Sequence, residues 1–278
     1  MARATGRRDF VPRLETLEDR CTPAASGVGA FDPATATWFL RNTAAPGAPD
    51  VGQFQYGPPG SIPVVGDWNG DGRSDIGVVV PSSMTWLLRF GTSGGPPDAG
   101  VFQYGPIGSI PVVGDWNGNG ADSIGVVVPG SMTWLLRSRP TAGNPDAGVF
   151  RYGPLGSIPV VGNWNLDGRS DIGVVVPTSM TWLLHFNATA GNPDAGVFQY
   201  GGVGTIPVVG DWDGSLTSEV GVLEPKSRTW LLHLGANGGP PDAGVFQYGP
   251  PGISAAVGDY AAPFTGPLFI PSSPPLVL

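Results

Sequence analysis

The sequence predicts an all-β protein, a five-bladed β-propeller, and three observations lead to this prediction. The first is a 48-residue repeat, marked by five tryptophans: Trp38, Trp86, Trp134, Trp182 and Trp230. The second is that phenylalanine and an acidic or amide residue recur at the same interval. The third is that 45 glycines and 31 prolines among 278 residues indicate many tight turns, while 41% hydrophobic residues suffice for a core. A fixed period of this size is typical of repeat architectures.

Each repeat contains four segments with strand character. In the repeat of Trp86 they cover residues 85–89, 99–104, 109–114 and 124–128. These segments are short, β-branched or aromatic, and bounded by turn residues. Several are apolar on both faces, which is typical of a sheet that is covered on both sides. Four short antiparallel strands per repeat describe a propeller blade, and the alternative, a β-solenoid, normally repeats in shorter coils.

The ends of the chain are predicted to close the ring. One strand type has a surplus copy, because it occurs at residues 28–31 and again at 268–270. We expect the last blade to combine strands from both ends, which removes exposed edges, but the sequence leaves open which end supplies the surplus strand. The predicted domains are a disordered or short-helical leader (1–27), the propeller (28–270) and a C-terminal tail (271–278).

The charge of the chain restricts its partners. The net charge is −8, and residues 28–278 hold nine basic and eighteen acidic side chains. This field disfavours nucleic acid and suits cations or neutral ligands such as sugars. Cys21 is the only cysteine, so no internal disulfide can form. We expect no transmembrane segment, because the chain has no run of 18 apolar residues. We also expect a monomer whose partner is an unknown protein or glycan.

The strongest chemical motif is the first loop, residues 67–75, with the pattern D-x-N-x-D-G-x-x-D. Oxygen-bearing side chains at alternate positions can converge on one hard cation where a glycine allows the turn. The predicted calcium ligands are Asp67, Asn69, Asp71 and Asp75, with the backbone carbonyl of Arg73. The opening matches an EF-hand loop, but position twelve is Val78 and the flanks are strands. The alternative is an Asx-type turn capped by its own side chains without metal.

Three further loops keep this pattern to different degrees. The third loop (163–171) lacks only the charge of its first ligand, and its ligands would be Asn163, Asn165, Asp167, Arg169 and Asp171. The second loop (115–123) has its last acid displaced by one residue, and the fourth (211–219) lacks the glycine at position six. Their weaker candidate ligands are Asp115, Asn117, Asn119, Asp211, Asp213 and Glu219. Affinity falls as charged ligands are lost, so the predicted order is first, third, then second and fourth.

These loops lie between a Pro-Val-Val-Gly-Asp strand and an Ile-Gly-Val strand, and this arrangement resembles the FG-GAP or VCBS repeats of integrin-α-type propellers. The resemblance covers residues 28–270 and implies calcium-stabilised blades, adhesion or extracellular binding, and an extracellular or cell-surface location. Two features depart from the family: five repeats instead of seven, and Val79-Val80-Pro81 in place of Gly-Ala-Pro. Five blades also resemble tachylectin-2-type lectins. The segment Leu14-Glu15-Thr16-Leu17-Glu18-Asp19-Arg20 resembles an N-terminal motif of planctomycete surface and exported proteins.

Other residues are candidates for binding or catalysis. An indole follows the first acid or amide of each loop and could form a platform for a sugar, although packing between blades is favoured: Trp68, Trp116, Trp164 and Trp212. His185 and His233 replace arginines of the repeat, which predicts a solvated strand end. No nucleophile–base motif is present, so we expect a non-enzymatic binding module, with a lectin as the alternative. A glycan-active enzyme is supported only by Glu224, which replaces a valine of the repeat.

Overall fold

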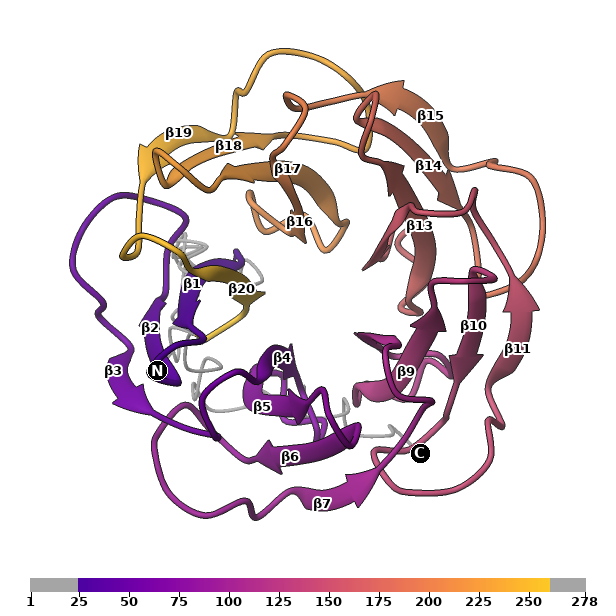
Figure 1. Ribbon diagram of the computed structural model, residues 1–278. Helices are drawn as coiled ribbons and strands as arrows, with labels where there is room; N and C mark the ends of the chain where they lie inside the picture. Colours follow the sequence, from indigo (N-terminus) through magenta and orange to yellow (C-terminus); the bar gives the residue numbers. More distant parts are fainter. Residues whose placement is uncertain (1–24, 261–278) are drawn as a thin grey trace, which may run out of the picture.

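A computed structural model describes residues 25–260 and confirms the five-bladed β-propeller. Five four-stranded antiparallel sheets surround a central axis (Figure 1). The blades are β4–β7, β8–β11, β12–β15, β16–β19 and a closing blade with the strand order β20-β1-β2-β3. We name the strands of each blade A to D from the centre outward. Residues 1–24 of the predicted leader, residues 261–270 of the predicted propeller and the predicted tail (271–278) lie outside the described residues, and β1 already begins at Gly27.

The strand bounds repeat closely from blade to blade. The A strands are β4 (Ile62–Gly66), β8 (Ile110–Gly114), β12 (Ile158–Gly162), β16 (Ile206–Gly210) and β20 (Ser254–Gly258). The B strands are β1 (Gly27–Asp32), β5 (Asp75–Val80), β9 (Ser123–Val128), β13 (Asp171–Val176) and β17 (Glu219–Glu224). The C strands are β2 (Thr37–Arg41), β6 (Thr85–Arg89), β10 (Thr133–Leu136), β14 (Thr181–His185) and β18 (Thr229–His233). The D strands are β3 (Gly52–Gln55), β7 (Gly100–Gln103), β11 (Gly148–Arg151), β15 (Gly196–Gln199) and β19 (Gly244–Gln247).

The core follows from the sequence of the strands. The B strands are buried on both faces, because they lie mid-sheet between neighbouring blades. The C strands alternate, and the five repeat tryptophans point inward with no exposed surface. In the blade β4–β7, Trp86 donates its indole N–H to the carbonyl of Tyr104 (3.1 Å) and stacks on Phe102 (6.3 Å between ring centroids). These five indoles are the largest fully buried side chains of the described residues, and each removes a large apolar area from water.

The N-terminal segment closes the ring. β1 pairs with β20 in antiparallel register, so that Ala30 faces Ala255 and Gly27 faces Gly258. The surplus strand therefore comes from the start of the chain, a point that the sequence left open. The rival segment at residues 268–270 lies outside the described part of the chain. Closure gives β20 a B-strand partner, as β4, β8, β12 and β16 have in their own blades.

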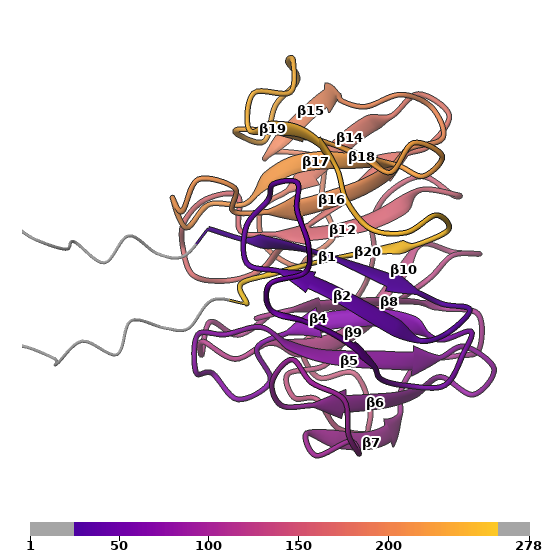
Figure 2. The same ribbon diagram turned by 90° about the vertical axis from the view of Figure 1, so that its left-hand side faces the viewer.

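The disc, seen from the side in Figure 2, has two faces that carry different connections between strands. The loop face carries the A–B loops and the start of the C–D connections, as the bond from Gly91 N–H to Asp75 shows. The turn face carries the B–C and D–A turns, which meet where Gly60 N–H donates to the carbonyl of Pro33. Within residues 25–260, no helix has the length and apolar character needed to cross a bilayer.

Candidate metal centre

In the first loop, the carboxylate of Asp67 caps its own loop. Asp67 Oδ1 accepts the backbone N–H of Gly70 at 2.6 Å, and Oδ2 accepts that of Gly72 at 2.7 Å. The N–H groups of Asn69 and Asp71 also point at Oδ1. Gly70 and Gly72 have φ of 74° and 81°, a left-handed conformation that glycine adopts without strain. This is the Asx-type arrangement that the sequence offered as the alternative to a metal loop.

The remaining predicted ligands of the first loop fall into two groups. Asn69 and Asp71 contact each other, with Nδ2 of Asn69 3.1 Å from Oδ2 of Asp71. Asp75 is almost fully buried, and its two oxygens accept N–H bonds from Trp68 (3.1 Å) and Gly91 (2.6 Å). Burial raises the pKa of Asp75 to about 6, against the lowering effect of these two bonds. Asp75 thus ties the loop to the C–D connection rather than joining the carboxylates of Asp67 and Asp71.

The third loop repeats this geometry with fewer bonds. Oδ1 of Asn163 accepts one loop N–H, from Leu166 at 2.9 Å. Nδ2 of Asn165 donates to Asp167, and the backbone N–H of Arg169 donates to Asp167 as well. Asp171 accepts the N–H groups of Trp164 and Asn187, and burial raises its pKa. The second loop closes likewise on Asp115, with Asn117 and Asn119 capping the next N–H groups.

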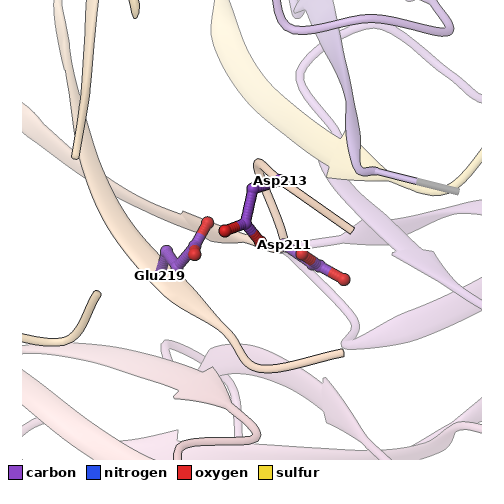
Figure 3. A group of neighbouring side chains, drawn as sticks. All are labelled: Asp211, Asp213 and Glu219. Atoms are coloured by element: carbon purple, nitrogen blue, oxygen red, sulfur yellow. The ribbon is translucent and has the colours of Figure 1, made fainter. Parts of the chain in front are cut away.

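The fourth loop differs, because it gathers three carboxylates. Oxygens of Asp211, Asp213 and Glu219 all lie within 4.8 Å of one another, the one such group of three acidic, histidine or cysteine side chains in the described chain. Figure 3 shows the carboxylate of Glu219 pointing toward that of Asp213. Glu219 is one methylene longer than Asp75 and holds one backbone bond, from Trp212 N–H at 2.7 Å. Burial, with the negative charges of Asp213 and Asp211, raises the pKa of Glu219 to about 7.

Leucines replace glycines in the third and fourth loops. Leu166 stands at the position of Gly70 with φ of 63°, and Leu216 at the position of Gly72 with φ of 69°. A side chain in this left-handed region costs about 1 kcal/mol or more per residue. Both leucines are exposed, so burial does not offset that strain. The fourth loop therefore combines backbone strain with clustered charge.

A reciprocal clasp joins each A–B loop to the next blade, and sequence reasoning missed it. Ser170 N–H donates to the carbonyl of Asp115 (2.8 Å), and Asp115 N–H donates back to the hydroxyl of Ser170 (2.8 Å). The same pair of bonds occurs five times, between residues 67 and 122, 115 and 170, 163 and 218, 211 and 26, and 259 and 74. The last two pairs join the closing blade to its two neighbours. The signal in the sequence was the serine that precedes the last acid in three loops.

Asp122 is the acid that the sequence showed as displaced in the second loop. It occupies the clasp position, and its Oδ2 accepts the N–H of Asp67 at 2.9 Å, while Ser123 takes the place of Asp75. Burial is the main cause that raises the pKa of Asp122 to about 7, and the nearby charges of Asp67, Asp115 and Asp75 add to it. The displaced acid therefore belongs to the contact between two blades.

The indoles of the loops pack between blades. Trp68, Trp116 and Trp212 are 6 to 8% exposed, and each donates its Nε1–H to a strand B carbonyl at 3.2 Å. Trp164 is partly exposed, and its Nε1 has no hydrogen-bond partner. Their burial favours packing between blades over the role of a sugar platform. They offer little ring face to a sugar.

The two histidines are buried, so the prediction of a solvated strand end is wrong. His185 stacks on Tyr152 of the preceding blade (5.4 Å), and its Nδ1 lies 2.7 Å from Asp194. His233 repeats this with Tyr200 and Asp242. The arginines at this position form ion pairs with the equivalent aspartates, Arg41 with Asp50, Arg89 with Asp98 and Arg137 with Asp146. In all five blades this side chain holds the C–D connection, and the histidine ring replaces a longer arginine without becoming exposed.

Glu224 has a local structural partner. Its side chain accepts a hydrogen bond from the hydroxyl of Ser227 within the B–C turn. Asp32, at the same repeat position, accepts one from Thr35 at 2.7 Å. Glu224, the residue that suggested a glycan-active enzyme, thus caps a turn on the turn face.

Comparison with known proteins adds no relative: no family model matches the chain, and no curated protein or solved structure shows significant similarity to it. The five-bladed fold rests on the structure itself, and the FG-GAP/VCBS resemblance stays a prediction.

Proposed function

We propose that this propeller is a non-enzymatic binding module of the FG-GAP/VCBS type whose A–B loops bind Ca²⁺ at the cell surface or outside the cell. The observation that carries the proposal is the group formed by Asp211, Asp213 and Glu219. Three carboxylates so close repel one another unless a proton or a cation neutralises them. Calcium accepts six to eight oxygen ligands in irregular geometry, which suits a strained loop that gathers carboxylate oxygens.

The role of the ion would be to hold the loop face together. Each A–B loop is clasped to the next blade, so an ion bound in one loop also fixes a contact between blades. At extracellular affinities of about 0.1–1 mM, each site adds modest stability by mass action. The first and third loops stay candidate sites, with the ligands given by the sequence.

Thermal melting in calcium and in chelator tests the proposal. We expect millimolar Ca²⁺ to raise the melting temperature, and Asp213→Asn to remove most of the increase. Asp71→Ala reports separately on the first loop, and Asp32→Asn on the turn face, the same change outside the A–B loops, serves as the matched control. Magnesium should have a smaller effect, because it demands octahedral geometry. Equal melting temperatures in calcium and chelator would overturn the calcium proposal.

A lectin is the second candidate, favoured by a cleft between the blades β8–β11 and β12–β15. This cleft of about 280 Å³ on the loop face is lined by Trp116, Arg169, Asn187 and Thr189, among others. Amide, guanidinium and hydroxyl groups beside an aromatic edge suit the hydroxyls of a sugar. A glycan array with wild type and Asn187→Ala tests this. Binding that the variant loses would support the lectin, and an array without any bound glycan would eliminate it.

A further inference from the structure

The turn face carries one protruding tip on each blade. Each D–A turn follows the pattern Gly-x-x-Gly, and in three successive blades the third residue is a large aliphatic: Ile107, Leu155 and Val203. These residues are 74, 72 and 74% exposed, the highest values among the exposed large hydrophobic residues of the described chain. Pro59 and Pro251 occupy this position in the other two blades. The tips therefore form a ring of apolar points around the axis.

The polar groups next to these tips are satisfied internally. In every B–C turn two hydroxyls pair with each other, for example Ser83 with Thr85 at 2.7 Å. The same pair recurs at 35 with 37, 131 with 133, 179 with 181 and 227 with 229. A hydroxyl that already has a partner loses less free energy when water leaves it. The turn face is therefore suited to partial dehydration.

The charges of the molecule lie mainly on the other side. Within residues 25–260, the turn face carries two acidic side chains, Asp32 and Glu224, against three basic ones, Arg151, Lys226 and Arg228. All other acidic residues of this range belong to A–B loops, to the loop-face ends of the strands or to C–D connections. The disc is thus strongly acidic on the loop face and at the neighbouring rim, and close to neutral on the turn face.

We propose that the turn face docks onto the surface of an anionic lipid bilayer, with the three aliphatic tips entering the boundary between headgroups and acyl chains. The charge distribution orients the disc, because an anionic surface repels the loop face and admits the turn face. Apolar side chains at this depth, beside basic ones, are the usual elements of interfacial binding.

The spacing of the tips favours a bilayer over a rigid protein partner. Each tip belongs to its own blade, and packed sheets lie about 10 Å apart or more. A protein interface needs a contiguous, well-packed apolar centre, whereas a fluid interface accommodates isolated apolar points one by one. Both ends of the described chain lie on the loop face, since residues 26 and 259 take part in its clasps. The turn face therefore carries neither of them.

Vesicle co-sedimentation of the full chain tests the proposal. Vesicles of phosphatidylcholine with a quarter phosphatidylglycerol are compared with pure phosphatidylcholine, in chelator, so that the result is independent of calcium binding. We expect binding to the anionic vesicles, weakened about tenfold or more in the triple variant Ile107→Thr, Leu155→Thr, Val203→Thr.

The matched control is the triple variant Val101→Thr, Val149→Thr, Val197→Thr, which changes residues that are 62 to 64% exposed on the outer D strands. This control should bind as the wild type does, and equal melting temperatures would show that all three proteins fold. The proposal is overturned if the wild type does not sediment with vesicles or if both triple variants lose binding equally. It is also overturned if ultracentrifugation shows a dimer that the tip variant dissociates, because the turn face would then bind a second copy.

Discussion

The first and fourth loops have related sequences and different chemistry. The first loop matches the calcium pattern in full, and its Asp67 and Asp75 are occupied by six backbone N–H bonds. The fourth loop matches less well, and it brings three carboxylates together around Glu219. Both loops keep the capping first acid, since Asp211 still accepts the backbone N–H groups of Gly214, Ser215 and Leu216. The consensus pattern therefore fixes the turn. Two exchanges, Asn69 to Asp213 and Asp75 to the longer Glu219, add the third carboxylate and bring it close to the others.

The largest effect that we expect concerns Glu219. Its folded-state pKa of about 7 exceeds its ordinary value of 4.5, so the folded protein holds a proton that the unfolded chain has lost between these pH values. This contribution to stability is complete below about pH 4.5 and disappears as the pH rises through 7. Glu219→Gln should raise the free energy of unfolding by about 2 kcal/mol at pH 8 in chelator, and little at pH 5. Urea unfolding at both pH values measures this, and equal shifts would contradict it.

Exchanging ligands between the two loops sharpens the comparison. Asn69→Asp with Asp75→Glu gives the first loop the three acids of the fourth. We expect about a tenfold gain in calcium affinity, or about 1.4 kcal/mol, measured by calorimetry in the Asp213→Asn background. Asn69→Asp alone is the control, because without the longer Glu the buried carboxylate still faces Trp68 and Gly91. An equal gain from the single variant would show that side-chain length is unimportant.

Backbone strain gives a reciprocal pair of variants. Leu216→Gly relieves a left-handed leucine in the fourth loop and should stabilise the protein by about 1 kcal/mol. Gly72→Leu introduces that strain in the first loop, where a Cβ would meet nothing within 4 Å, and should destabilise it by a similar amount. Thermal unfolding in chelator measures both. Shifts of the same sign would mean that contacts, and not backbone conformation, separate these loops.

The smallest effect is expected at the clasp. The first loop is clasped by Asp122, and the fourth by Ser26. Asp122→Ser installs the residue of the other clasps and removes a carboxyl whose pKa is raised to about 7. Because this side chain is partly exposed, we expect a gain of only about 0.5 kcal/mol at pH 8, vanishing near pH 4. Ser170→Ala, which lacks the acceptor altogether, should instead destabilise the protein at both pH values.

How far the sequence predicts the site can be judged from particular residues. Side chains whose partners lie within one turn were predictable, as Asp67 and its alternative Asx-type role show, because the chain spacing fixes those contacts. The clasps were not, because their partners are separated by 55 residues, or by 185 where the ring closes. The burial of His185 was missed for the same reason: the ring that covers it, Tyr152, belongs to the preceding blade.

The sequence by itself determined the number of blades, the four strands of each and the buried tryptophan of each C strand, because a strict period repeats the same local pattern in every copy. Only the tertiary structure decided that the start of the chain completes the ring, which blades touch through Asp122, and which loop gathers its carboxylates. These features depend on how neighbouring sheets meet in space, and a repeat looks the same in sequence whichever way its edges are joined.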